Sequence, residues 1–393
     1  MRIAIDTLFE HPDHPTGAID YLRNVASTFP KIAAQHDYYL LVSSRNIRYF
    51  REFERANVRF IDCLRSNENT PLRILIQQTL VPFEIKRHKI DVLFAPGNVC
   101  PFWGNICCVL KINTLHHYHA PNLIGRTRAI YRRYVFEQSA RRANRILANT
   151  LTTKEEICRL LCIPEQKVTV TGEAFYDIYA PLSEDQTKPV LAKHRLRRDY
   201  VLFLSSLYRY KNADTLIKSF AYLLQQKPSD TELVIVGQDY DSQIPKLQAL
   251  SRSLGILDRV RFLGFVPTED IPAIYCGANV FVFPSLIETF GKPLVEAMRC
   301  GIPIVASNTS CIPEVLGGAG LLVDPLDLVE MGSAIGRAIS DQELRKDLIA
   351  RGLRRAESFS WENAAKSTLA EIERSFQDWK RARGEVISTD GSN

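Results

Sequence analysis

Two carboxylates, Glu288 and Glu296, lie in one short stretch with seven residues between them. An ionised carboxylate only accepts hydrogen bonds, so it suits the vicinal hydroxyls of a sugar or a ribose. The N–H groups of Phe290, Gly291 and Lys292, at the start of a predicted helix, favour an anionic group such as a phosphate. Together these groups predict a site for a nucleotide-sugar. The alternative is that each glutamate is an ordinary solvated surface residue.

The elements that position these groups form a predicted βαβ unit. The apolar run Val280–Phe283 predicts a buried strand, which stops at Pro284 because proline cannot continue a central strand. Pro293 suits the first turn of a helix, Gly301 ends that helix, and a second strand follows at Ile304–Ala306. In open α/β sheets ligands bind at the carboxyl edge, where the loop after the first strand and the helix start are both expected.

Short apolar strands alternate with helical patterns along the chain, which predicts an α/β fold with doubly wound parallel sheets. The predicted strands outside this unit are Ile3–Ile5, Tyr38–Val42, Val58–Asp62, Val92–Ala95, Cys107–Ile112, Arg145–Ala148, Tyr200–Ser205, Leu233–Gly237 and Arg261–Phe265. A chain of 393 residues exceeds one ordinary core, so we expect two domains, residues 1–180 and 181–361. Residues 177–198 read as a linker, and residues 384–393 as a flexible tail.

The string from Pro284 to Ser307, P-S-x-x-E-T-F-G-K-P-L-V-E-A-M-x-C-G-x-P-I-V-A-S, resembles the signature of the GT4-type (glycosyl transferases group 1) retaining glycosyltransferases. Residues 313–324, PEVLGGAGLLVD, resemble its continuation. The resemblance implies the GT-B fold, in which two Rossmann-like domains face each other across a cleft. Residues 1–180 would then bind the acceptor and residues 181–361 the nucleotide-sugar. A last helix at about residues 362–381 would pack back on the first domain.

The same resemblance implies retaining, metal-independent transfer of a hexose from a nucleotide-diphosphate-sugar to a glycan or lipid-linked acceptor. A UDP- or GDP-sugar is the expected donor, no cofactor is expected, and cell-surface polysaccharide or glycolipid synthesis is the expected setting. Two other functions stay open. One is a sugar-nucleotide epimerase or hydrolase that uses the same donor pocket. The other is a catalytically silent binding or scaffold protein, which is motivated by Ser206 and Ile112 at positions where the family pattern has other residues.

The resemblance also implies roles for individual residues in the second domain. Lys211 and the N–H groups at Phe290–Lys292 would assist departure of the nucleoside diphosphate. Glu288 would bind hydroxyls of the reacting sugar, and Glu296 would bind the ribose. Thr289 replaces the glycine that usually follows the first glutamate, so we expect its side chain to affect donor selectivity.

A second family pattern, G-R-L-x-x-x-K-N, is matched at Lys211 and Asn212, which are therefore expected at the donor. Ser205 and Ser206 stand where the pattern has glycine and arginine. Because a diphosphate leaving group needs cationic neutralisation, Arg209 would supply the missing charge from another turn of the loop. A site that uses lysine alone is the alternative.

Three positions are expected to approach the donor through their main chain. Gly237 and Val266 follow predicted strands of the second domain, and in relatives the main chain near the latter turn contacts the nucleobase. Gly17, after a Pro-rich loop in the first domain, stands where family members carry a glycine-rich turn near the donor phosphate.

A histidine that faces the reacting sugar often follows the fifth strand in the family, but Ile112 occupies that position here. His116 is the expected substitute, with His117 and His119 as rivals. An ordinary structural or surface role is the alternative for all three histidines.

The first domain carries the basic excess. Residues 1–180 hold 24 Lys and Arg against 17 Asp and Glu, whereas the remainder holds 26 against 27. A predicted helix mixes apolar residues with arginines, of which we single out Arg126, Arg128, Arg132 and Arg133. Such a helix is expected at the acceptor side or on an anionic membrane surface, and a solvated helix face is the alternative. Nucleic acid is not an expected partner, because no recognised motif accompanies the charge.

The remaining signals concern metals, thiols and location. Asp239-Tyr240-Asp241 spells D-x-D, but we expect a solvated loop there and no metal site. The nine cysteines are scattered without a C-x-x-C pair, which indicates reduced thiols. No apolar run is long enough for a signal peptide or a membrane span, so we expect a cytoplasmic protein, peripheral at the inner face of the membrane.

Overall fold

The computed structural model describes residues 1–9, 17–64, 70–119, 125–173, 178–240 and 242–384. The chain forms two compact units: Met1–Ala174 together with Ser360–Asn393, and Phe175–Phe359. The sequence predicted the boundary between residues 180 and 181, slightly later in the chain. The last helix belongs with the first unit, although the whole second unit separates it from that unit in the sequence.

Within the described residues, the first unit holds one parallel sheet of seven strands: β1 Arg2–Asp6, β2 Asp37–Ser43, β3 Val58–Leu64, β4 Val92–Ala95, β5 Cys107–Lys111, β6 Arg145–Ala148 and β7 Val168–Val170. Their order is β3-β2-β1-β4-β5-β6-β7. β1 is an interior strand, because Ile3 pairs with Tyr38 on one side and with Val92 on the other. Every connection therefore crosses over, and helices cover both faces of the sheet.

The helical segments described in this unit are α1 Gly17–Ile32, α2 Thr70–Arg87, α3 His116–His119, α5 Arg126–Arg142, α6 Leu151–Leu161 and α15 Trp361–Arg381, with 3-10 turns at Ile47–Tyr49, Arg51–Phe53 and Glu165–Lys167. Side chains alternate between two cores across the sheet. Ile3 and Ile5 pack with α1 and α15 on one face, whereas Ala4 packs with α2 and α6 on the other. Because both faces of the sheet are covered, consecutive residues in the middle of these strands are apolar, as in Ile3, Ala4 and Ile5.

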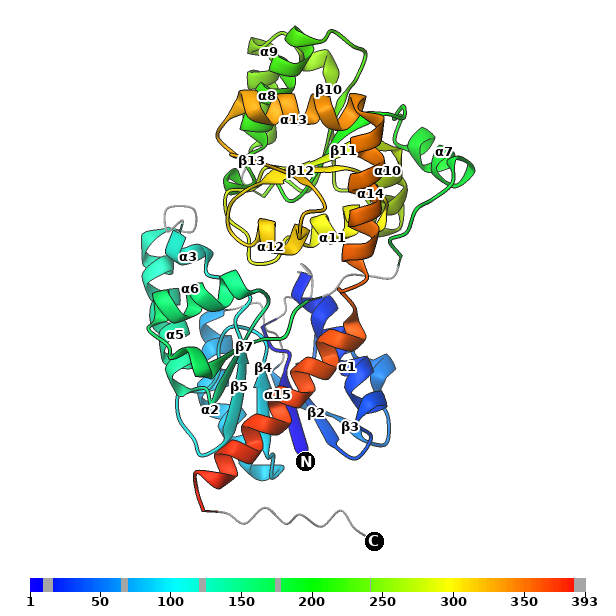
Figure 1. Ribbon diagram of the computed structural model, residues 1–393. Coiled ribbons are helices and arrows are strands. Elements are labelled where there is room, and N and C mark those ends of the chain that lie inside the picture. Colours follow the sequence, from blue (N-terminus) through cyan, green and yellow to red (C-terminus); the bar gives the residue numbers. More distant parts are fainter. Residues whose placement is uncertain (10–16, 65–69, 120–124, 174–177, 241, 385–393) are drawn as a thin grey trace. The chain divides into compact units, whose positions relative to one another are not determined.

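Helix α15 packs beside α1 on one face of the first sheet and completes the core there (Figure 1). It begins where the Ser360 hydroxyl accepts a hydrogen bond from the Asn363 N–H at 3.1 Å. Leu369, Ile372 and Phe376 then recur at helical spacing and are buried with α1. Burying each such side chain stabilises the unit by about 1.5–3 kcal/mol.

Within the described residues, the second unit holds a six-stranded parallel sheet: β8 Tyr200–Leu204, β9 Leu233–Val236, β10 Val260–Gly264, β11 Ala278–Phe283, β12 Ile304–Ser307 and β13 Leu321–Val323. Their order, β10-β9-β8-β11-β12-β13, repeats the arrangement of the first sheet. The helices are α7 Glu184–Lys193, α8 Ala213–Gln226, α9 Ile244–Ser253, α10 Ile271–Gly277, α11 Lys292–Arg299, α12 Ile312–Leu316, α13 Leu328–Ser340 and α14 Gln342–Ala356, with 3-10 turns at Arg209–Lys211, Leu257–Arg259 and Thr268–Asp270. The predicted α/β class with two doubly wound parallel sheets is confirmed.

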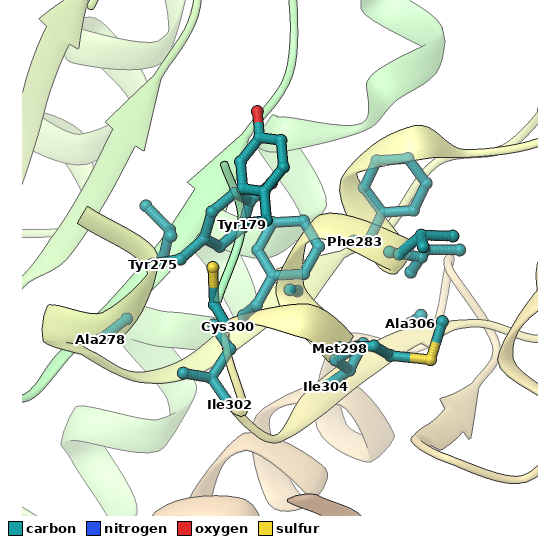
Figure 2. Packing of buried hydrophobic residues seen from close by; sticks show 14 of the residues in the cluster. Tyr179, Tyr275, Ala278, Phe283, Met298, Cys300, Ile302, Ile304 and Ala306 are labelled. Carbon is teal, nitrogen blue, oxygen red and sulfur yellow. The ribbon is translucent and has the colours of Figure 1, made fainter. Parts of the chain in front are cut away.

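Two cores again lie on opposite faces of this sheet. Val280 and Val282 of β11 pack with α8, α9 and α13, whereas Phe281 and Phe283 pack with α10, α11 and α12. Figure 2 shows the second of these cores, to which both Phe283 and Met298 of α11 belong. β11 is thus an interior strand that is buried on both faces, and the predicted site follows its carboxyl end.

The predicted linker at residues 177–198 is instead partly helical. Ser183 and Gln186 form a reciprocal capping box that starts α7. Leu191 on α7 is buried in the core of the second unit. The sequence prediction was wrong because Pro189 and the surrounding charges hide the short helical period.

Gly237 marks a close approach between two strand ends at the carboxyl edge of the second sheet. Its φ is +146°, and a Cβ at this position would lie 1.8 Å from the main-chain oxygen of Ser205. Its N–H donates to the Gly264 carbonyl at 2.9 Å. Only glycine fits, so the residue joins the ends of β8, β9 and β10.

We expect Gly237→Ala to lower the free energy of unfolding by about 3 kcal/mol or more, since it combines strain with a main-chain clash. Gly255→Ala is a matched control, because Gly255 also has a positive φ, +71°, but nothing lies within 4 Å of its Cβ position. Gly255→Ala should lower the free energy of unfolding by about 1–2 kcal/mol, because only the left-handed backbone conformation opposes it. Urea unfolding of both variants measures the difference, and equal losses would show that the close approach is unimportant.

Candidate active site

Two loops meet at the carboxyl edge of the second sheet, because β8 and β11 are neighbours there. β11 pairs with β8 on one side and β12 on the other. The loop after β8, residues 205–212, therefore runs beside the loop after β11, residues 284–291. A hydrogen bond from the Leu286 N–H to the Tyr210 carbonyl at 2.9 Å joins them directly.

The Lys211 ammonium and the Glu288 carboxylate contact each other across these loops. Nζ of Lys211 donates to Oε1 of Glu288 at 2.5 Å, and the two side chains are only 12% and 8% exposed. The sequence predicted separate partners for these residues, a phosphate and a sugar. The structure shows that the two side chains form a buried ion pair with each other, and removing one partner of such a pair costs about 3–5 kcal/mol.

Neighbouring groups hold both members of the pair in place. Nζ of Lys211 lies 5.1 Å from the ring centre of Tyr210 and 5.6 Å from that of Phe283. The hydroxyl of Ser310 accepts from the Glu288 N–H at 3.1 Å and donates to the Glu288 carbonyl at 2.6 Å. The ammonium is thus framed by aromatic rings, and the backbone that carries the carboxylate is clamped.

Glu296 has a different partner one turn into α11. The Tyr275 hydroxyl, on α10, donates to Oε2 of Glu296 at 3.0 Å. Tyr275 is fully buried (Figure 2), and burial together with the Glu296 charge raises its pKa, so the phenol stays protonated. Because one carboxylate oxygen is fixed this way, Glu296 is an oriented acceptor and not a freely rotating surface residue.

The start of α11 is shaped by Gly291 and Phe290. Gly291 is the N-cap in a left-handed conformation, φ +81°, and a Cβ there would lie 3.1 Å from Cδ1 of Leu294. Phe290 is buried and packs edge-to-face on Phe359 with ring centres 5.6 Å apart. Lys292 is the first residue of the helix and is half-buried. A glycine N-cap leaves the amides of the first turn without a side-chain cap, which favours an anion at this end.

Asn212, expected at the donor, faces the protein. Its Nδ2 donates to the carbonyls of Pro284 and Pro325 at 3.1 and 2.7 Å, and its Oδ1 accepts from Thr215 at 2.7 Å. The side chain therefore braces the loops that carry Lys211 and Glu288.

Arg209 is exposed and lines a cavity beside α8 and α9. Within the described residues, no contact joins it to Lys211 or Glu288. Lys211 is thus the cation that the structure places beside Glu288, and Ser206 leaves the usual arginine position without a charge.

The other predicted donor residues of the second unit lie at the same edge. Thr289 is half-buried beside Glu288. Gly237 joins the strand ends, as described above. The Val266 side chain is buried in the core, so any contact with a nucleobase belongs to its main chain. Phe265, which the sequence did not single out, precedes it and is 71% exposed.

The three candidate histidines of the first unit have different surroundings on α3, which follows β5. His117 is buried with its ring centre 4.6 Å from that of Phe136. Burial, and then the charges of Arg132 and Arg133, lowers its pKa to about 3, so its ring is neutral. Nε2 of His119 contacts Oε1 of Glu156 at 2.8 Å. His117 thus packs in the core and His119 contacts Glu156, whereas His116 is half-buried.

Gly17 is the first residue of α1, and the loop before it, residues 10–16, lies outside the described residues. Two buried charged residues at the carboxyl edge of the first sheet were missed by the sequence reasoning. Asp6 accepts from the Leu8 N–H at 2.9 Å and from Gln77 at 2.6 Å. Lys111 is fully buried, with Nζ 3.3 Å from the Gly172 carbonyl. Each lies at a strand end, which is the signal that could have found it.

Second-unit residues that support the site were also missed, notably Tyr210, Tyr275 and Ser310. Tyr210 directly precedes Lys211, so the run Tyr-Arg-Tyr-Lys carried a usable signal. Tyr275 and Ser310 reach the site only through packing of other elements. No pattern near the two glutamates indicates either residue.

The D-x-D string does not form a recognisable metal site in the part of the chain that is described. Asp239 accepts from the Gln243 and Ile244 N–H groups at 2.7 and 3.0 Å, which caps α9. Asp241 lies outside the described residues. Among described residues, no group of three or more His, Cys, Asp or Glu could hold a metal ion. All nine cysteines are free thiols.

Family models match both parts of the chain. Residues 186–355 match the model described as glycosyl transferases group 1, and residues 16–172 match the model described as glycosyltransferase family 4.

Curated relatives agree with these models. An O-antigen chain mannosyltransferase B of Escherichia coli is 33% identical over 262 residues, which cover 66% of this chain and 67% of that protein. A D-inositol 3-phosphate glycosyltransferase of Salinispora tropica is 35% identical over 252 residues, which cover 59% of this chain and 51% of that protein. The chain thus spans two thirds of the first relative and about half of the second.

Solved structures share the fold at low sequence identity. HepE of Anabaena, crystallised with UDP, has a TM-score of 0.73 at 19% identity, covering 95% of this chain and 100% of HepE. A glycosyltransferase of Rickettsia africae also has a TM-score of 0.73, at 16% identity, covering 96% of this chain and 98% of its own. The signature, the paired sheets and these relatives show that the chain belongs to the GT4-type, or group 1, glycosyltransferases and has their GT-B architecture of two Rossmann-like units.

Proposed function

We propose that this glycosyltransferase moves a hexose from a nucleoside diphosphate sugar to a glycan or lipid-linked acceptor, with retention of configuration and without a metal ion. The observation that carries the proposal is the Lys211–Glu288 pair, because it places a cation and a carboxylate side by side at the carboxyl edge of the second sheet. In open α/β sheets that edge is where ligands bind. A donor needs both groups, one for its diphosphate and one for its sugar.

The two side chains can serve a donor without separating. An ammonium has three N–H groups, and the contact with Glu288 uses one of them. The others can donate to diphosphate oxygens, together with the amides at the start of α11. The second carboxylate oxygen of Glu288 can accept from a sugar hydroxyl. This arrangement stabilises the leaving diphosphate with protein groups, the role that a metal ion plays elsewhere.

Glu296 suits the ribose of the same donor. The Tyr275 hydroxyl donates to its Oε2, which orients the carboxylate, and a carboxylate accepts hydrogen bonds from vicinal hydroxyls. Attack by the acceptor on the face that the diphosphate leaves would retain the configuration. We assign no covalent nucleophile to this step. His116 is the first-unit residue that we propose for contact with the reacting groups.

The names of the relatives guide the choice of donor and product. The Escherichia coli relatives include an O-antigen chain mannosyltransferase B and a serotype-specific mannosyltransferase WbdA, and HepE has been crystallised with UDP and with UDP-glucose. We therefore propose a GDP- or UDP-sugar as donor, with mannose tested first, and a cell-surface polysaccharide or glycolipid as product.

An anionic membrane surface is a second proposed partner, favoured by a gathering of exposed apolar side chains on the first unit. Three neighbouring segments carry them: α2, the loop of residues 99–106, and α5. Gln78 of α2 donates to the Cys100 carbonyl at 3.2 Å, and Phe102 packs edge-to-face on Tyr134 of α5 with ring centres 6.5 Å apart. Among the exposed large apolar residues described, those on these segments are Leu72, Leu75, Phe83, Trp103, Ile130, Tyr131 and Tyr134.

The four arginines singled out on α5 contribute unequally to this apolar face. Arg128 is exposed, whereas Arg132 is half-buried. Arg133 turns to its own unit, with its guanidinium 4.9 Å from the ring centre of Tyr118. The side chain of Arg126 lies outside the described residues. Arg128 is therefore the arginine that we assign to anionic lipid, while Arg133 has a structural role.

No helix among the described residues has the length and apolar character needed to cross a bilayer. Contact with a membrane would therefore involve side chains of the apolar face just described and the headgroup region.

We expect the purified protein to be stabilised against heat by GDP-mannose or UDP-glucose, and to release the nucleoside diphosphate faster when a glycolipid extract is added. The product should keep the anomeric configuration of the donor by NMR, and excess EDTA should leave the rate unchanged. Equal release of free sugar without acceptor would indicate a hydrolase. Absence of both binding and turnover with every sugar nucleotide would overturn the proposal.

The variant Lys211→Met should weaken binding of the nucleoside diphosphate and lower kcat/KM by about 10²–10³-fold, because it removes the cation at the leaving group. Glu288→Gln should keep diphosphate binding within a few-fold but lose preference for the sugar. The double variant removes both charges, so it distinguishes loss of phosphate binding from damage by an unpaired charge. Lys218→Met, on exposed α8 surface, is the control. Calorimetric titrations that show unchanged diphosphate binding in Lys211→Met would contradict the assigned role.

Vesicles that contain phosphatidylglycerol should retain the protein at low salt, and vesicles of neutral phosphatidylcholine should retain less. Combining Ile130→Asp with Tyr134→Asp should abolish retention, because these side chains are 67% and 59% exposed on the proposed face. Leu151→Asp is the matched control, since Leu151 is 58% exposed on α6. Sedimentation measures retention, and equal behaviour of the two variants would remove the membrane proposal.

A further inference from the structure

A cavity of about 360 Å³ lies between the first turns of α8 and α9 in the second unit. Leu207, Leu247 and Leu250 give it an apolar part, while Arg209 and Lys246 bring two cations to its wall. The volume is within the range of small-molecule sites in proteins. Of the residues predicted for the donor, only Arg209 contributes to the lining, so the cavity is distinct from the Lys211–Glu288 pair.

The charges of the cavity do not cancel. Asp214 is the one acidic residue in the lining that the structure describes, and its Oδ2 is 3.8 Å from Nζ of Lys218 outside the cavity. Among the described residues, neither Arg209 nor Lys246 has a carboxylate partner. By contrast, Asp239 at the start of α9 is already engaged by amide groups. An anionic group bound in the cavity could therefore accept hydrogen bonds from both Arg209 and Lys246.

The cavity is connected to the donor site by stacked tyrosines. Tyr208 lines the cavity, and its ring stacks on Tyr240 and on Tyr210 with centres 5.5 and 5.6 Å apart. Tyr210 in turn lies 5.1 Å from Nζ of Lys211. Because Tyr208 stacks on Tyr210, a shift of the Tyr208 ring would change the packing of Tyr210.

We propose that this cavity binds a small anion that carries an apolar group, separately from the nucleotide-sugar, and that its occupant alters the donor site through the tyrosine stack. The apolar group lies against the three leucines, and the anionic group contacts Arg209 and Lys246. The binding stands independently of the proposed function, whereas the effect on the donor rests on it.

Phenyl phosphate combines an apolar ring and an anion, and its binding to the full chain can be followed by saturation-transfer NMR. We expect saturable binding, with inorganic phosphate and benzyl alcohol each binding more weakly. Lys246→Glu and Arg209→Glu should each weaken binding about tenfold or more, since charge reversal replaces attraction by repulsion. Arg252→Glu, an exposed position in the last turn of α9, should stay within about twofold of the unchanged protein.

Equal affinity in Lys246→Glu and Arg252→Glu would overturn the site. Displacement of phenyl phosphate by UDP or GDP at matching stoichiometry would overturn its separateness, because the cavity would then belong to the donor site. An unchanged donor affinity at saturating phenyl phosphate would remove the coupling alone. If phenyl phosphate binds as expected while no sugar nucleotide is bound or consumed, the proposed function fails and the cavity assignment stands.

Discussion

The contact between the Lys211 ammonium and the Glu288 carboxylate depends on the strand order of the second sheet. Each group comes from a different strand-to-helix loop, and the loops meet only because β8 and β11 are adjacent parallel strands. A single buried charge at this edge would cost several kcal/mol, so the two charges are stable there as a pair. The pair keeps an ammonium and a carboxylate at one edge. The other N–H groups of Lys211 and the second carboxylate oxygen of Glu288 can then bind a ligand.

The residues around this pair divide into those that offer groups to a ligand and those that hold the loops. Asn212 has its amide and carbonyl engaged by three protein partners, and Ser310 clamps the backbone of Glu288. Gly237 brings the strand ends together. Loop ends at a sheet edge carry many main-chain polar groups, which must be satisfied when buried. A motif residue can therefore serve to hold the loops in place.

The cations of the second unit illustrate the same division. Lys211 is buried against a carboxylate and two aromatic rings, whereas Arg209, only two residues earlier, is exposed beside a cavity. Arg209 and Lys211 are the first and last residues of one 3-10 turn, and their side chains lie in different surroundings. In the first unit, His116, His117 and His119 are likewise divided by the short helix α3 among a half-buried position, the core and a contact with Glu156.

The sequence by itself determined the fold class, the parallel strands, the family and the position of Glu288, Glu296 and Lys211 at a sheet edge, because these features follow from local periodicity and from proline and glycine at strand and helix ends. It missed α7, where Pro189 masks the helical period. Only the tertiary structure decided that Lys211 bonds Glu288, that Tyr275 orients Glu296 and that Asn212 braces the loops. These partners are far apart in the chain and are brought together by strand order and helix packing, which no local pattern encodes.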